Sequence, residues 1–245
     1  MTHRAVAPVI LMAVLVSLVA TGCSSVEYWK DQLTLPSRPA AAVQPQAAPQ
    51  QTGAAPRSTT AFGTKFEEDV QLARTLTEEF WQDRFQAAGK TYRPLERFVA
   101  YSGRNGPSCG GRPALPQNAF YCPIGNFVAY DQTWMRSLWK QLGDGAVYVI
   151  IPHEIGHSIQ AQLRSDFSFN VERELQADCY AGGALKGIID AGRLQADPGD
   201  DEELLDNLAA AGDPDDNWMR EDAHGTPAQR QQSFTKGFTQ GVDAC

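Results

Sequence analysis

The chain has 245 residues, of which 29 are acidic and 21 basic, so its formal net charge is −8. This length suits one substantial domain with appended segments. The acidic balance argues against nucleic acid as a partner, and against a basic surface that would hold the protein on a membrane by charge.

The first 22 residues have the pattern of a secretory signal. A short basic start containing Arg4 precedes a mostly apolar stretch over 5–20. That stretch is shorter than the roughly 20 residues of a membrane span. Small residues then precede Cys23, as in the box at which bacterial lipoproteins are cleaved and lipidated. We therefore expect a signal peptide over 1–22, lipid on Cys23, and attachment to a bacterial membrane on its extracytoplasmic side, in the cell envelope. An ordinary signal or an uncleaved anchor is the alternative.

A proline-rich segment follows the signal. Residues 31–61 contain five of the fifteen prolines, separated mainly by alanine, glutamine, serine and threonine. Such a composition is typical of a flexible tether, and about 30 residues of flexible coil span roughly 30 Å. We expect a tether over 23–61 and a folded domain over 62–245.

Helical patterns outnumber strand patterns in this domain. A helix with a capping box at Thr64 and Glu67 is expected to run to Gly89. Three short strands are expected at 95–101, 119–122 and 127–130. Further helices are expected after Asp131 as a cap, through 147–160, over 171–191 before Gly192, over 201–211 after Asp200 as a cap, and from Thr226, with Pro227 in its first turn. These patterns predict an α+β domain that is mostly helical and has a small β-sheet.

The stretch 147–160 contains the pattern His-Glu-x-x-His. On a helix, His153 and His157 lie on one face, so both imidazoles can reach one metal ion. Glu154 lies one step round the helix, where it can hold a water molecule, as a zinc hydrolase requires. Pro152 either kinks this helix or stands near its start. The alternative is an ordinary, partly buried helix face.

A catalytic zinc site usually has three protein ligands and one open position. Glu174 is the best candidate for the third ligand, and Asp178 shares its helix face and can accept a hydrogen bond from a liganding imidazole. Gly182 and Gly183 would let this helix approach the first one closely. A solvated helix start at Glu174, with His224 as the third ligand, is the alternative.

The last block of polar residues precedes and enters the final helix. His224 could stabilise the oxyanion of a tetrahedral intermediate, and Arg230 could pair with a carboxylate. A surface histidine and a surface arginine are the alternative. The acidic stretches 197–206 and 213–216 lack the spacing of a calcium loop, so we expect solvated loops and helix caps there.

Four cysteines remain beyond Cys23, and an even number in an exported chain predicts two disulfides. Three pairings can be drawn. We prefer Cys109–Cys122, which closes a short loop, and Cys179–Cys245, which ties residue 245 to the core. Metal ligation by cysteine is the weaker alternative, because the sequence has no Cys-x-x-Cys.

Four sequence blocks in order resemble the bacterial family of putative neutral zinc metallopeptidases. They are Phe120-Tyr121-Cys122-Pro123, the run from His153 to Gln160, the run from Glu174 to Gly182, and the run from His224 to Arg230. The resemblance covers about residues 95–245. It implies a zincin-like fold in which His153, His157 and Glu174 hold Zn²⁺, Asp178 supports a ligand, and His224 and Arg230 lie near the reacting centre.

The resemblance also implies an activity. We expect a membrane-tethered metallopeptidase in which Glu154 is the general base for attack of water on a peptide or protein substrate. By analogy with zincins, the strand at 127–130 is expected to be an edge strand that pairs with an extended substrate. Two alternatives stay open: a zinc amidase for a non-peptide or cell-wall amide, and an inactive envelope binding protein.

Overall fold

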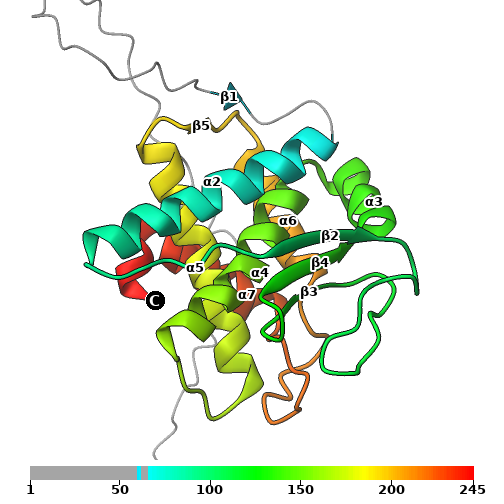
Figure 1. Ribbon diagram of the computed structural model, residues 1–245. Helices are drawn as coiled ribbons and strands as arrows, with labels where there is room; N and C mark the ends of the chain where they lie inside the picture. Colours follow the sequence, from blue (N-terminus) through cyan, green and yellow to red (C-terminus); the bar gives the residue numbers. More distant parts are fainter. Residues whose placement is uncertain (1–59, 62–65) are drawn as a thin grey trace, which may run out of the picture.

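The computed structural model describes residues 60–61 and 66–245 (Figure 1). The expected signal peptide, Cys23, the tether up to residue 59 and the Thr64 cap lie outside these residues. The elements follow one another as β1 (Thr60–Ala61), α2 (Phe66–Ala87), β2 (Arg97–Tyr101), β3 (Ala119–Cys122), β4 (Phe127–Asp131), α3 (Gln132–Leu142), α4 (Gly145–Leu163), α5 (Asn170–Asp190), β5 (Leu194–Gln195), α6 (Asp200–Ala210), α7 (Pro227–Gln240) and a final 3₁₀ turn, η1 (Val242–Ala244). The predicted α+β class is confirmed.

Of the three predicted N-terminal helix caps that fall in the described residues, two are present. The Asp131 carboxylate accepts the backbone N–H groups of Thr133 and Trp134 at the start of α3. Thr226 begins α7 with a capping box and Pro227 in the first turn. The predicted cap at Asp200 is wrong by one position. The chain enters α6 through Gly199 at a φ of 106°, so Asp200 is already the first helical residue.

Helix α4 is the centre of the fold (Figure 1). Fifteen of its nineteen residues are buried, and it packs against α2, α3, α5, α6 and β3. It begins seven residues before Pro152, so the proline lies within the helix rather than at its start. Because α4 carries His153 and His157, the motif is held by a buried helix that five other elements contact.

The sheet has three strands in the order β2-β4-β3. Strand β4 pairs in parallel with β2 and antiparallel with β3, and all five of its residues are buried. The expectation that 127–130 is an edge strand is therefore wrong. Its run Phe127, Val128, Ala129 is apolar on both faces, which suits a central strand, and β2 and β3 are the edge strands.

The expected role of the glycines in α5 also needs correction. A Cβ at Gly182 would lie 2.1 Å from the Phe234 carbonyl oxygen of α7, and one at Gly183 would press on Val242. These glycines therefore admit the C-terminal segment. The close approach of α5 to α4 occurs at Gly156, where a Cβ would lie 3.2 Å from the Ala177 carbonyl oxygen.

The described residues contain two disulfides, and they are the preferred pairs, Cys109–Cys122 and Cys179–Cys245. The parallel pairing of β1 with β5, in which Thr60 lies opposite Leu194, was not predicted. Among the helices of the described residues, none combines the length and the apolar character that a membrane crossing requires.

Candidate active site

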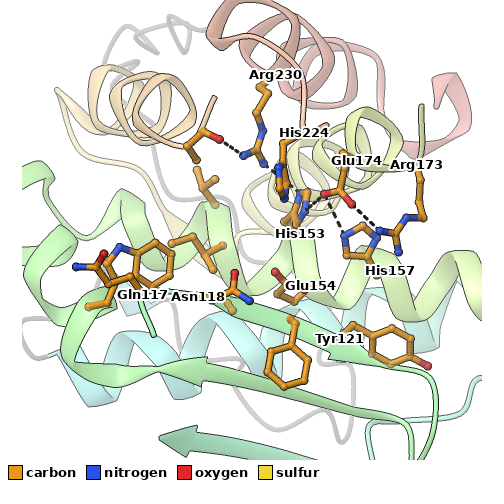
Figure 2. Close-up of a pocket in the computed structure, with 16 residues that line it drawn as sticks. Gln117, Asn118, Tyr121, His153, Glu154, His157, Arg173, Glu174, His224 and Arg230 are labelled. Atoms are coloured by element: carbon orange, nitrogen blue, oxygen red, sulfur yellow. Dashed lines mark hydrogen bonds and ion pairs between the residues drawn. The ribbon is translucent and has the colours of Figure 1, made fainter. Parts of the chain in front are cut away.

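A pocket of about 340 Å³ lies between β3, α4, α5 and the start of α7 (Figure 2). One wall consists of residues 117–121, that is, the two residues before β3 and the first three residues of β3. His153, Glu154 and His157 of α4 line the pocket, together with Arg173 and Glu174 of α5. The volume is within the range of ligand and substrate sites.

Three side chains converge in this pocket. The Nε2 atom of His153 lies 3.2 Å from Oε2 of Glu174, and Nε2 of His157 lies 3.4 Å from the same oxygen. The three ligand atoms all lie within 4.8 Å of one another. The two rings cross at 85° with centroids 4.7 Å apart. The fold therefore brings together two imidazoles and one carboxylate, without His224.

The other nitrogen of His153 is held by a buried ion pair. Its Nδ1 lies 2.8 Å from Oδ1 of Asp178. Arg230 donates to both oxygens of Asp178, from Nε at 2.9 Å and from Nη2 at 2.7 Å, and to the Ala211 carbonyl at 2.9 Å. His153, Asp178 and Arg230 are all buried. Arg230 therefore pairs with a carboxylate, as expected, and acts on His153 through Asp178.

His157 has a neutral partner instead. Its Nδ1 lies 2.9 Å from Oε1 of Gln160. Gln160 in turn donates to the Arg173 carbonyl at 2.7 Å and to Oε1 of Gln176 at 3.2 Å. Because both Nδ1 atoms face acceptors, each ring keeps a proton on Nδ1, and Nε2 is the nitrogen with which each would bind a metal ion. Sequence reasoning missed Gln160, although its spacing of three residues from His157 was a usable signal.

The electrostatics of this cluster favour a cation. Burial alone would raise the pKa of Glu174, but the imidazoles of His157 and His153 hold it well below its usual range. Burial would likewise raise the pKa of Asp178, yet Arg230 and His153 lower it. Burial opposes charge on His153, but Asp178 and Glu174 raise its pKa to about 10. The ionised carboxylates of Glu174 and Asp178 thus stabilise positive charge near the Nε2 atoms of His153 and His157. The residues therefore fit a divalent metal ion.

A second acidic group has the opposite electrostatics. Carboxylate oxygens of Asp144, Asp200 and Glu203 also lie within 4.8 Å of one another. Burial and neighbouring carboxylates raise the pKa of Asp144 to about 7 and that of Asp200 to about 6. Protons can relieve the repulsion there, because no histidine or arginine completes the group.

Glu154 and His224 occupy the remaining polar positions around the cluster. Glu154 is buried and follows His153 on α4. His224 is about half exposed and lies at the end of a loop over 213–225. The Asp213 carboxylate accepts the backbone N–H groups of His224 at 2.6 Å and of Gly225 at 3.0 Å, so it places His224 at the pocket. Asp213 belongs to a stretch that was expected to be solvated, and nothing in its sequence spacing signals this contact.

The family model described as "Putative neutral zinc metallopeptidase" matches residues 9–245. Among curated proteins, the uncharacterized protein YpfJ of Escherichia coli strain K12 is 31% identical over 195 residues, which cover 69% of this chain and 66% of that protein, slightly under two thirds. The uncharacterized protein Rv2575 of Mycobacterium tuberculosis strain H37Rv is 30% identical over 215 residues, covering 71% of this chain and 73% of that protein. No solved structure matches the chain.

Proposed function

The chain belongs to the family of putative neutral zinc metallopeptidases, and from that premise we propose that it is a zinc-dependent peptidase. One observation carries the proposal: Nε2 of His153 and Nε2 of His157 converge on a single oxygen of Glu174, at 3.2 and 3.4 Å, in a pocket that Glu154 also lines. Two imidazoles and one carboxylate are a donor set of catalytic zinc sites, which keep a further position open.

We assign the metal to His153, His157 and Glu174. When bound there, Zn²⁺ supplies a lowered pKa for water and polarisation of a carbonyl oxygen. Asp178 and Gln160 orient the two imidazoles by accepting their Nδ1–H groups. Arg230 keeps Asp178 ionised and in place, so it is a positioning residue rather than a group that touches substrate.

Glu154 is the general base. It takes a proton from the attacking water and then delivers it to the leaving amine, which balances the cleavage of the peptide bond. His224 donates a hydrogen bond to the oxygen on which negative charge develops. Its half-exposed position at the rim of the pocket suits a group that meets the substrate from outside.

We propose that the substrate lies along β3. This strand is at the edge of the sheet, and Ala119, Phe120 and Tyr121 line the pocket. An extended peptide can add to such an edge through backbone hydrogen bonds. The substrate strand proposed here is thus β3, which takes the role that we had expected of 127–130.

We also propose an extracytoplasmic location with a lipid anchor on Cys23. The support is the signal-like segment over 1–22, the cysteine that directly follows it, and the two disulfides of the folded domain, which suit an oxidising compartment. The proline-rich tether would then link the anchor to the domain.

The first test is cleavage of a mixed peptide library by the full chain loaded with zinc, followed by mass spectrometry. We expect Glu154→Gln to lower the turnover number by about 10²- to 10⁴-fold, because it removes the base and no ligand. Zinc content, measured by atomic emission, should be unchanged. The matched control is Glu221→Gln, an exposed glutamate outside the pocket, which should leave cleavage intact.

Other outcomes separate the alternatives. Cleavage that survives both Glu154→Gln and removal of the metal by a chelator would contradict the proposed chemistry. Stoichiometric zinc without cleavage of any peptide would favour a non-peptide amide, which a cell-wall fragment assay can test, or a binding role without turnover.

A further inference from the structure

Two arginines, Arg173 and Arg230, line the pocket, and they differ in how many of their N–H groups already have acceptors. Arg230 is buried, and its Nε, Nη1 and Nη2 groups all donate to Asp178 or to the Ala211 carbonyl. Arg173 is the first-turn neighbour of Glu174 on α5, and its side chain is 47% exposed. Arg173 is therefore the arginine of this pocket that a substrate can reach.

Arg173 is held in one orientation by its own helix. Its Nε and Nη2 groups donate to Oδ1 of Asn170 at 3.1 and 2.7 Å, and Nη2 also donates to Oε1 of Glu174 at 2.9 Å. Asn170 is fixed in turn, because its Nδ2 donates to the Ala223 carbonyl at 3.0 Å. A guanidinium that is already ordered loses less conformational entropy when it binds a ligand than a free one does.

These contacts use only one edge of the guanidinium. Within the described part of the chain, Nη1 of Arg173 donates no hydrogen bond. Figure 2 shows the side chain reaching from α5 to end beside His157 and Glu174, on the side of the pocket where Tyr121 lies. The free donors are therefore next to the centre at which the bond would be cut.

The opposite end of the pocket has a different chemistry. Val149 and Ile150 line it, one turn before His153 along α4, together with Trp134 of α3. A peptide lying along β3 would thus have an apolar surface on one side of the scissile bond and the Arg173 guanidinium on the other. Because guanidinium groups bind carboxylates with two parallel hydrogen bonds or one charged bond, the polar end favours an anionic group.

We propose that Arg173 is a specificity-determining residue that selects substrates with a carboxylate adjacent to the scissile bond. This inference rests on the proposed peptidase function. The carboxylate has two sources with the same chemistry: an acidic side chain, or the free C-terminus of the peptide. The two are distinguished by the peptides in the test.

The test uses the zinc-loaded full chain and peptides matched in sequence. One pair carries glutamate or glutamine next to the scissile bond, and the other carries a free or an amidated C-terminus there. We expect kcat/KM to be roughly tenfold higher for one of the two carboxylate peptides, in line with a hydrogen bond to a charged group. The pair that shows the ratio identifies the source.

Arg173→Gln should bring this ratio close to one, and Arg173→Lys should restore part of it. The control is Arg164→Gln, which changes an exposed arginine outside the pocket and should leave the ratio unchanged. Because Arg173 also touches Glu174, zinc content is measured for each variant. The ratio itself does not depend on the fraction of enzyme that is active, so a weakened metal site cannot imitate the result.

An unchanged ratio in zinc-loaded Arg173→Gln, or equal kcat/KM for all peptides in the unmodified protein, would overturn the inference. If the protein cleaves none of the peptides, the proposed function fails, and the dissociation constants of the same fluorescently labelled peptides decide the inference separately. The inference is supported if a carboxylate peptide binds roughly tenfold more tightly than its matched neutral peptide and loses this advantage in Arg173→Gln. Equal dissociation constants refute it.

Discussion

Asp178 is the most constrained residue around the proposed metal centre. It is fully buried, its Oδ1 faces His153, and both of its oxygens accept from Arg230. A buried carboxylate is unfavourable unless its charge is paired and its lone pairs are used, and here both conditions are met. The residue therefore has two tasks, to orient an imidazole and to neutralise a buried guanidinium.

The variant Asp178→Asn tests both tasks, one through the stability of the fold and the other through zinc affinity. The amide keeps the shape but leaves Arg230 buried without an anion, so we expect the free energy of unfolding to fall by about 3 kcal/mol. Zinc affinity should fall by about 10- to 100-fold, because His153 loses its carboxylate partner. Chemical denaturation and zinc competition titrations measure the two effects. Asp190→Asn on the same helix, where an exposed ion pair with Lys186 is lost, should cost less than about 1 kcal/mol. Equal effects in the two variants would refute this account.

Sequence reasoning reaches only part of this site. His153, Glu154 and His157 can be identified because their spacing on one helix is a local property. Glu174 and Asp178 were candidates, but spacing could not decide between Glu174 and a distant histidine, since that choice depends on how α5 packs on α4. The contact of Gln160 with His157 lies within one helix and could have been predicted, whereas its contacts with Arg173 and Gln176 depend on how α5 packs on α4 and could not.

At the level of elements, one carboxylate joins the sheet, a helix and a wall of the pocket. Oδ1 of Asp131 accepts the first N–H groups of α3, while Oδ2 accepts the N–H groups of Gly103 at 3.2 Å and of Gln117 at 3.0 Å. Gln117 lines the pocket and leads into β3. The end of β4 therefore holds in place the loop over 102–118, which precedes the proposed substrate strand.

This arrangement predicts a pH-dependent stability. Burial alone would raise the pKa of Asp131, but hydrogen bonds from Gln117 and three other backbone N–H groups lower it below its usual 3.8. A carboxyl whose pKa is lower in the folded state stabilises the fold above its unfolded pKa, and this stabilisation is lost as the pH falls through the folded value. We expect Asp131→Asn to be about 2 kcal/mol less stable than the unmodified protein at pH 7, because charged acceptors are lost. The deficit should shrink below about pH 4. Urea denaturation across this pH range measures it, and a deficit that stays constant would contradict the assignment.

For the elements too, features that depend on nearby residues were predicted, and features that depend on distant residues were not. The bounds of β3 were predicted to the residue, and the caps at Asp131 and Thr226 follow from short-range side-chain chemistry. The central position of β4 was not predicted. An apolar run shows that a strand is buried on both faces, but it does not tell a central strand from an edge strand that other elements cover. The pairing of β4 with β2 is parallel and spans a long connection, which no local pattern encodes.

At the scale of the whole domain, strand β1 and the loop that carries His224 lie at opposite ends (Figure 1). In Figure 1, β1 and β5 lie beyond α2, whereas the 213–225 loop that carries His224 lies at the opposite end. The described chain begins at β1, and the expected tether leads into it. The expected tether would therefore enter the domain at the end opposite the 213–225 loop (Figure 1). The Cys179–Cys245 disulfide, which links residues 66 positions apart, would help to keep the domain folded in an oxidising compartment.

The proposed lipid at Cys23 can be tested directly. Expressed in a bacterial host, the unmodified chain should enter the detergent phase of Triton X-114, because an acylated N-terminus favours a hydrophobic phase. Cys23→Ser removes the thiol that would carry the lipid, so that variant should lose the label from radioactive palmitate. Ser24→Ala, a change of similar size at the neighbouring position, should keep both properties. An unmodified chain without label, or a Cys23→Ser chain that keeps it, would contradict lipid attachment at Cys23.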